Sequence, residues 1–206
     1  MTKINKNNLT ALILAGGKSS RMKGQDKGLL KIGNNYLITY LNSLSKIFCS
    51  KVFVNINRNE EIYKEFGLTT CCDITENYQG PLAGIYTGLK KCKTEYLITL
   101  PCDGPFIDKR YFKKMLVLEN NYDISVAYDG ERLQPVYCLI RKSLEKNLEI
   151  FLRSGERKID KWFNLIKFKM IDFSNSKEMF VNINDEKELF KYKNKIRNIL
   201  ENNEKR

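Results

Sequence analysis

The sequence predicts an α/β fold in which helices cover both faces of a mostly parallel sheet that becomes mixed in its later strands. Short apolar runs alternate with stretches of helical spacing through the first half of the chain, which is typical of consecutive strand–helix–strand units. The run Leu9–Leu14 is continuously apolar instead of alternating with polar residues, as expected for a strand that is covered on both faces.

Each expected element follows from its own pattern. Compact or β-branched runs predict strands at Leu9–Leu14, Lys51–Ile56, Leu68–Cys72 and Glu95–Leu100. Helical spacing predicts helices over Tyr36–Phe48, with Asn34 and Asn35 as start signals, over Asn57–Gly67 and over residues 82–92. The later half is more mixed, with strand-like runs at Asp123–Tyr128, Gln134–Ile140 and Lys167–Asp172, and a last helix over Asp185–Leu200.

Length and composition indicate one domain. A chain of 206 residues and 24.1 kDa suffices for one sizeable core, and it contains no internal repeat and no Pro/Gly-rich linker. We therefore expect a single domain over residues 1–206, with flexible ends at 1–8 and 201–206. No apolar run approaches the roughly 18–20 residues that span a bilayer, and the N-terminus lacks signal-peptide features. These observations predict a cytoplasmic protein without a membrane partner.

Cysteine and histidine usage narrows the possible chemistry. The six cysteines form no C-x-x-C pair, and the chain has no histidine that could complete a Cys/His zinc site. We expect reduced, mostly buried thiols. Without histidine, any acid–base or metal chemistry must use carboxylates, lysines, backbone groups or a metal ion.

The net charge of +12 favours an anionic partner: phosphates, nucleic acid or a membrane surface. Scattered lysines fit an ordinary basic surface equally well, and no nucleic-acid recognition motif is present, so we expect no specific nucleic-acid partner. One short segment is different, because five cations face a single carboxylate, Asp26, there: Lys18, Arg21, Lys23, Lys27 and Lys31.

A glycine turn follows the first strand and precedes these cations. Gly16 and Gly17 allow close approach of a ligand and expose backbone N–H groups that can bind phosphate oxygens. Arg21 and Lys27 can then neutralise a polyphosphate. The segment is not a P-loop, because that motif needs a glycine where Leu12 stands. A tight strand-to-helix turn without a ligand is the alternative interpretation of the glycine pair.

The segment LILAGGKSSRMKGQDKGLL resembles the signature of nucleotidyltransferases that include sugar-phosphate pyrophosphorylases and molybdenum-cofactor nucleotidyltransferases. Further segments follow in family order and make the chain similar to molybdenum cofactor guanylyltransferases: VNINRNEEIY (54–63), YQGPLAGI (78–85), LPCDGPFI (100–107), SGERK (154–158) and FVNIN (180–184).

The resemblance implies a Rossmann-like three-layer sandwich that transfers GMP from GTP to molybdopterin and releases pyrophosphate. Its implied partners are GTP, molybdopterin and recipient molybdoenzymes or their chaperones. Other nucleotidyltransferases remain open, namely a molybdopterin cytidylyltransferase or a sugar-phosphate pyrophosphorylase. An inert protein that binds and delivers the cofactor is a further alternative, although retention of both Lys27 and Asp103 argues against it.

The resemblance also assigns site residues, and most of them follow the carboxyl ends of expected strands, where open α/β sheets bind ligands. The implied catalytic residues are Arg21, Lys27 and Asp103. The implied nucleotide contacts are Leu14, Ala15, Gly16, Gly17, Lys27, Asn55, Asp73, Gly80, Gly84 and Asp103. On the pterin side the matching positions are Arg157, Lys158, Asn182 and Asn184.

Asp103 is the expected Mg²⁺ ligand, because this hard cation prefers oxygen donors and few protein contacts; helix capping is the alternative role. A phosphate monoester as nucleophile is already anionic, so no general base is expected.

Gly80, Gly84 and Gly88 recur every fourth residue, a spacing that also suits close packing of a helix. Relatives often carry a side chain where Gly104 stands, so we expect a looser loop there. Lys23 adds a residue before Gly24 and leaves the phosphate partner of Lys27 open.

Overall fold

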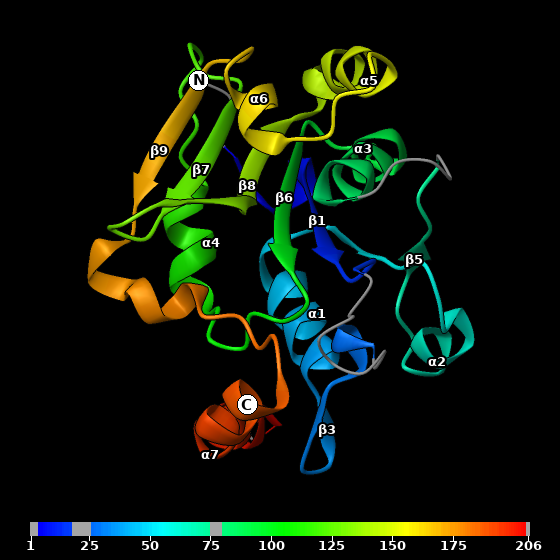
Figure 1. Ribbon diagram of the computed structural model, residues 1–206, viewed down its shortest axis with the longest axis vertical. Coiled ribbons are helices and arrows are strands. Elements are labelled where there is room, and N and C mark those ends of the chain that lie inside the picture. The colour runs from blue at the N-terminus through cyan, green and yellow to red at the C-terminus, as the bar shows by residue number, and fades with distance from the viewer. Residues whose placement is uncertain (1–3, 18–25, 75–79, 205–206) are drawn as a thin grey trace.

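The computed structural model describes residues 4–17, 26–74 and 80–204, and its centre is a seven-stranded sheet (Figure 1). Every strand except β8 runs in the same direction, so the sheet is mostly parallel and becomes mixed late in the chain, as predicted. In spatial order the strands are β5 (Thr70–Cys71), β4 (Lys51–Asn55), β1 (Leu9–Leu14), β6 (Tyr96–Pro101), β8 (Leu133–Arg141), β7 (Ile124–Tyr128) and β9 (Phe168–Asp172).

Helices cover both faces of this sheet and complete a three-layer sandwich. Ile13 of β1 belongs to the core beneath α1 (Leu37–Phe48), α4 (Lys109–Met115) and α7 (Glu186–Glu204). The adjacent Leu12 belongs to the core on the opposite face, beneath α3 (Pro81–Lys91), α5 (Glu145–Arg153) and α6 (Ile159–Phe163). The continuously apolar sequence of β1 is therefore explained by burial on both sides.

The strand order reverses direction at β1. The chain moves from β1 outward to β4 and β5, and then returns to place β6 on the other side of β1. β1 and β6 are parallel and in register, with Leu14 opposite Pro101, so the two strands end at the same level. Such a switch point, at the carboxyl ends of adjacent parallel strands, is where doubly wound sheets bind ligands.

Several expected boundaries were wrong for local reasons. Asn35 belongs to β3 (Asn35–Tyr36), which forms a small hairpin with β2 (Lys31–Ile32), and α1 starts only after it, without a side-chain cap. α2 is shorter than expected, Glu60–Glu65, because Asn59 adopts a left-handed backbone before it. The sequence analysis did not anticipate α4, α5 or α6.

Regular secondary structure reaches close to both ends of the described ranges, and the single domain with flexible ends stays a prediction. Residues Lys6–Asn8 form a short 3-10 helix that is capped by Asn5, and α7 continues to Glu204. The cysteines are free thiols, and all are buried except Cys72. In the part of the chain that the structure describes, no helix combines the length and apolarity that a membrane crossing requires.

β6 and β8 diverge near the end of β6. Their regular pairing stops at Ile98 and Leu139. Beyond that point the fully buried Thr99 continues the connection through its hydroxyl, which donates to the Val136 carbonyl at 2.7 Å and accepts from the Cys138 N–H at 3.2 Å. This side chain therefore holds the two strands together just before the chain reaches Asp103.

We predict that Thr99→Val lowers the free energy of unfolding by about 2–4 kcal/mol, because it takes this partner from the buried Cys138 N–H and from the half-buried Val136 carbonyl. Urea denaturation monitored by circular dichroism measures this. The matched control is Thr39→Val, which removes one partly buried hydroxyl bond to the Tyr36 carbonyl and should cost under about 1 kcal/mol. Equal losses in the two variants would contradict the bridging role.

Candidate active site

The glycine turn after β1 is held by the strands on both sides. The Ala15 N–H donates to the Asn55 carbonyl at 2.8 Å, and the Cys102 N–H donates to the Leu14 carbonyl at 3.0 Å. A Cβ on Gly16 would lie 2.7 Å from Asn57 Nδ2, so the absence of a side chain lets Asn57 pack against the turn. The turn is thus fixed between the ends of β4 and β6.

Asn55 and Asp73, which the resemblance assigned to the nucleotide, form one cluster beside this turn. Asn55 is buried, and its Nδ2 donates to Asp73 Oδ1 at 2.9 Å. Asn57 Nδ2 donates both to Asp73 Oδ2 at 3.0 Å and to the Gly16 carbonyl at 3.1 Å. Sequence reasoning missed Asn57, although the repeated Asn in VNIN is a signal that could have identified it.

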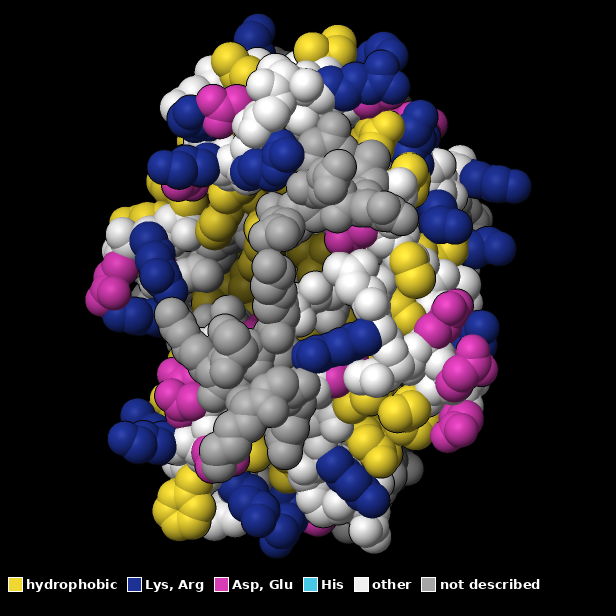
Figure 2. Space-filling view, turned by 45° about the vertical axis from the view of Figure 1, so that its right-hand side comes forward, with side chains coloured by type: hydrophobic (Ala, Val, Ile, Leu, Met, Phe, Trp, Pro, Cys, Tyr) yellow, Lys and Arg dark blue, Asp and Glu magenta, His cyan; other side chains and the backbone are white. Residues whose placement is uncertain are grey.

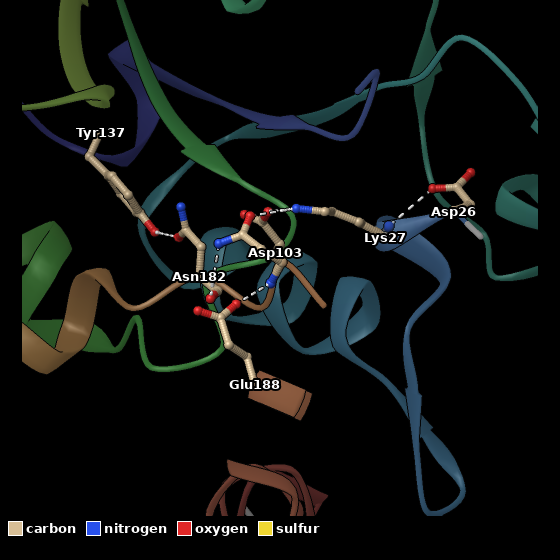
Figure 3. A network of polar contacts seen from close by, with 8 residues as sticks. Asp26, Lys27, Asp103, Tyr137, Asn182 and Glu188 are labelled. Atoms are coloured by element: carbon tan, nitrogen blue, oxygen red, sulfur yellow. Dashed lines mark hydrogen bonds and ion pairs between the residues drawn. The ribbon is translucent and has the colours of Figure 1, made fainter. Parts of the chain in front are cut away.

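Lys27 and Asp103 meet at the carboxyl end of β6, as Figure 3 shows. Lys27 opens the short 3-10 helix η3 (Lys27–Leu29). Its Nζ donates to Asp103 Oδ2 at 2.9 Å and to Asn184 Oδ1 at 2.7 Å. The two side chains of the ion pair are 20% and 13% exposed, so water screens the pair only in part. The two residues predicted for phosphate and metal therefore lie in direct contact.

The segment before α7 runs beside Asp103, and Figure 3 shows Asn182 next to Asp103 with Glu188 below it. The Ile183 N–H donates to the Asp103 carbonyl at 2.8 Å, and the Asn184 N–H donates to Glu188 Oε2 at 2.6 Å. Tyr137 donates its hydroxyl to Asn182 Oδ1 at 3.1 Å. Asn182 and Asn184, which were expected on the pterin side, thus lie directly beside Asp103 and Lys27.

The expectation that Gly104 loosens its loop was wrong. Gly104 is buried, and a Cβ at this position would lie 2.3 Å from the Tyr137 hydroxyl oxygen. The glycine makes room for Tyr137, which in turn binds Asn182. Burial, together with the nearby charge of Asp103, raises the pKa of Tyr137 well above its usual value, so the hydroxyl remains protonated and can donate.

For two of the three regularly spaced glycines, the structure favours the packing alternative. A Cβ on Gly84 would lie 2.4 Å from Asn55 Oδ1, and one on Gly88 would lie 2.6 Å from Leu12 Cδ2. Because Gly84 has no side chain, α3 can pack directly against the Asn55 side chain. Gly80 differs. It stands at the cap position of α3 with a φ of +110°, and among the described residues no atom lies within 4 Å of a Cβ added there. Its contact with a nucleotide stays a prediction.

The oxygen donors of this site suit Mg²⁺ better than a metal ion whose ligands are all protein side chains. Across residues 4–17, 26–74 and 80–204, no three His, Cys, Asp or Glu side chains gather in a metal-binding group. Asp103 offers one carboxylate, next to the amide oxygen of Asn184. Mg²⁺ commonly takes one or two carboxylates and completes its shell with water and substrate phosphates, so these residues fit that ion.

Cys102, next to Asp103, does not supply a nucleophile. Its thiol is buried, and burial, followed by the charge of Asp103, raises the pKa of the thiol well above its usual value. A protonated thiol is a poor nucleophile. The site thus contains a cation, carboxylates and amides, but no activated side-chain nucleophile among the described residues.

Some predicted residues lie elsewhere or outside the described ranges. Arg21, the third predicted catalytic residue, lies outside them. Lys158 takes the position before the first residue of α6, and Arg157 lies directly before it in the irregular segment between α5 and α6; their roles stay predictions. Figure 2 shows Lys and Arg side chains dispersed over one face and interspersed with Asp and Glu, which fits a generally basic surface.

Known proteins resemble this chain both in sequence and in fold. A molybdenum cofactor guanylyltransferase of Shewanella sp. (strain MR-4) is 37% identical over 178 residues, which cover 85% of this chain and 90% of that protein. Two solved structures share the fold. The molybdopterin-guanine dinucleotide biosynthesis protein A from Archaeoglobus fulgidus has a TM-score of 0.75 at 16% identity and covers 92% of this chain and 99% of its own.

The second is the 4-diphosphocytidyl-2C-methyl-D-erythritol synthase from Anaerococcus prevotii, with a TM-score of 0.71 at 14% identity, covering 96% of this chain and 99% of its own. Residues 11–168 match the family model described as the MobA-like NTP transferase domain. The match includes the glycine turn, Lys27 and Asp103. The chain therefore belongs to the MobA-like NTP transferase family.

Proposed function

We propose that this protein transfers GMP from GTP to molybdopterin, forming molybdopterin guanine dinucleotide and releasing pyrophosphate. The observation that carries the proposal is the contact between Lys27 and Asp103 at the switch point of the sheet, beside the glycine turn. The choice of guanine and molybdopterin is supported by relatives such as the Shewanella guanylyltransferase at 37% identity.

The triphosphate would lie along the glycine turn, and Lys27 would neutralise its charge. Lys27 Nζ is held by Asp103 and Asn184. Both partners accept hydrogen bonds, so they keep the ammonium group at the edge of the sheet, close to where a phosphate would arrive. A prepositioned cation needs little reorganisation when charge develops during the reaction.

Asp103 would hold Mg²⁺, and Asn184 offers a neighbouring amide oxygen. When bound, the ion would supply positive charge to the α-phosphate and to the departing pyrophosphate. Asp103 itself is kept in place by the bond from the Ile183 N–H to its carbonyl oxygen, and the segment that follows Ile183 also delivers Asn184 to Lys27. The segment of Ile183 and Asn184 therefore supports both Asp103, the expected metal ligand, and Lys27, the expected phosphate-binding cation.

The reaction requires no base from the protein. The terminal phosphate of molybdopterin attacks the α-phosphorus of GTP, a new P–O bond forms, and the bond to the β-phosphate oxygen breaks, so that its electron pair leaves with pyrophosphate. The attacking phosphate is already anionic at neutral pH. Cys102 and Tyr137 are protonated, so neither serves as a base, which agrees with a reaction that needs none.

The acceptor would be bound by the cations before α6, Arg157 and Lys158, together with Asn182. This assignment rests on the match of SGERK and FVNIN to the family segments. Cytoplasmic location and delivery to molybdoenzymes or their chaperones stay predictions. The alternatives are a cytidylyl or sugar-phosphate enzyme with the same phosphate site, and an inert binding protein.

Thermal unfolding with Mg²⁺ and each of GTP, CTP, ATP and UTP tests the choice of nucleotide. A ligand that binds only the native state raises the midpoint, by an amount set by its concentration relative to its dissociation constant. We expect GTP to give the largest rise. A larger rise with CTP or UTP would move the protein to a sister activity, and no rise with any nucleotide would contradict the proposal.

We predict that Asp103→Asn lowers kcat by about 10²–10³, because one charged contact in the transition state typically contributes about 3–4 kcal/mol. The matched control is Asp108→Asn, a change of the same kind at the cap of α4, where asparagine can also accept from the Arg110 N–H. Pyrophosphate release at several Mg²⁺ concentrations measures this effect. Wild-type turnover by Asp103→Asn would remove the carboxylate from the mechanism.

A further inference from the structure

Asp26, directly before Lys27, carries a carboxylate that is almost completely buried, with 4% of its side chain exposed. Its Oδ1 accepts from the Gly28 N–H at 3.0 Å and from the Tyr63 hydroxyl at 2.9 Å. Its Oδ2 accepts from Asn59 Nδ2 at 3.1 Å, and Arg58 Nε lies 3.8 Å away. Burying a carboxylate is costly unless such partners compensate.

Apart from Gly28, these partners come from a distant part of the chain. Arg58 and Asn59 follow β4, and Tyr63 lies on α2, whereas Asp26 caps η3, whose first residue is Lys27. Asn55 ends β4 and Asn57 follows it, directly before Arg58 and Asn59. The Asp26 carboxylate therefore joins the cluster around Asp73 to the backbone that carries Lys27.

Asn59 adopts an unusual backbone at this contact. Its φ of +57° makes it the one non-glycine residue with positive φ in the described ranges. It stands at the cap position of α2, yet its side chain makes no capping bond to that helix and donates to Asp26 instead. Backbone strain of this kind persists where the surroundings impose it, often at functional sites.

Tyr63 fits against η3 with no spare room. It is fully buried, and a Cβ on Gly28 would lie 2.1 Å from its hydroxyl oxygen. Burial, followed by the charge of Asp26, raises the pKa of Tyr63 far above its usual value. The hydroxyl therefore remains a donor at every ordinary pH, and the ring and the glycine together fix where η3 lies.

We infer that Asp26, held by Tyr63 and Asn59, is the positioning residue for Lys27. A helix as short as η3 contributes little stability of its own, so capping it does not explain a buried carboxylate with partners from two other segments. Through η3, the arrangement sets where Lys27 Nζ meets Asp103 and Asn184. Its catalytic consequence rests on the proposed function, but the positioning itself does not.

The first test measures the accessibility of Lys27 without any substrate. The protein is labelled briefly with an amine-reactive acetylating reagent, and the Lys27 peptide is quantified by mass spectrometry. We expect Tyr63→Phe to increase the labelling rate of Lys27 several-fold, because a shifted η3 weakens the bonds from Nζ to Asp103 and Asn184. Asp26→Asn should act in the same direction, since its amide places a donor against Tyr63 or Asn59.

The matched control is Tyr40→Phe, which also removes a hydroxyl that donates over 2.7 Å, in this case to the buried Ile107 carbonyl. It should lower the melting temperature about as much as Tyr63→Phe does while leaving Lys27 labelling unchanged. Equal labelling of Lys27 in the two variants would overturn the inference, because loss of stability alone would then account for the effect.

The second test is kinetic. Tyr63→Phe should lower kcat/KM for GTP by about 10- to 100-fold, the usual effect of misplacing a catalytic group. In a Lys27→Ala background the same change should alter kcat/KM by less than about twofold, because residues that act through one another are not additive. Full additivity would overturn the inference. A wild-type protein that turns over no nucleotide would refute the proposed function, while the labelling result would still decide the positioning.

Discussion

The parallel pairing of β1 with β6 is the constraint on which the site depends. Because Leu14 stands opposite Pro101, the glycine turn and Asp103 leave the sheet at the same level and next to each other. β4 pairs with the other side of β1 and brings Asn55 to the same edge. A slip of one residue in either pairing would turn every side chain of the shifted strand to the opposite face, so the register of these strands also fixes the geometry of the site.

At the carboxyl ends of β1, β4 and β6, the side chains can promote a reaction by stabilising charge. The chain has no histidine, and the buried Cys102 and Tyr137 stay protonated. What remains is the ion pair of Lys27 and Asp103, fixed by neighbours from η3 and from the segment before α7. Nucleotidyl transfer to an anionic phosphate needs this combination, because its catalysis consists of positioning and charge stabilisation.

Sequence reasoning predicted the parts of the site that local patterns determine. Asn55 and Asp103 lie together because parallel strands bring their carboxyl ends to one edge of the sheet, whereas Lys27 was assigned by the resemblance of the segment that follows the glycine turn. The contact between Lys27 and Asn184 could not be predicted, since these residues are 157 positions apart and meet only after the chain has closed around the sheet. The backbone of Asn59 and the fit of Gly104 against Tyr137 were missed for a related reason: tertiary contacts impose both of them.

The most direct test of the central claim is a product assay. The purified protein is incubated with Mg²⁺, molybdopterin and GTP or CTP, and the pterin products and pyrophosphate are quantified by mass spectrometry and an enzyme-coupled assay. The account predicts one pyrophosphate for each molybdopterin guanine dinucleotide formed with GTP, and little product with CTP. Nucleotide binding without any transfer, or transfer of CMP in preference to GMP, would contradict it.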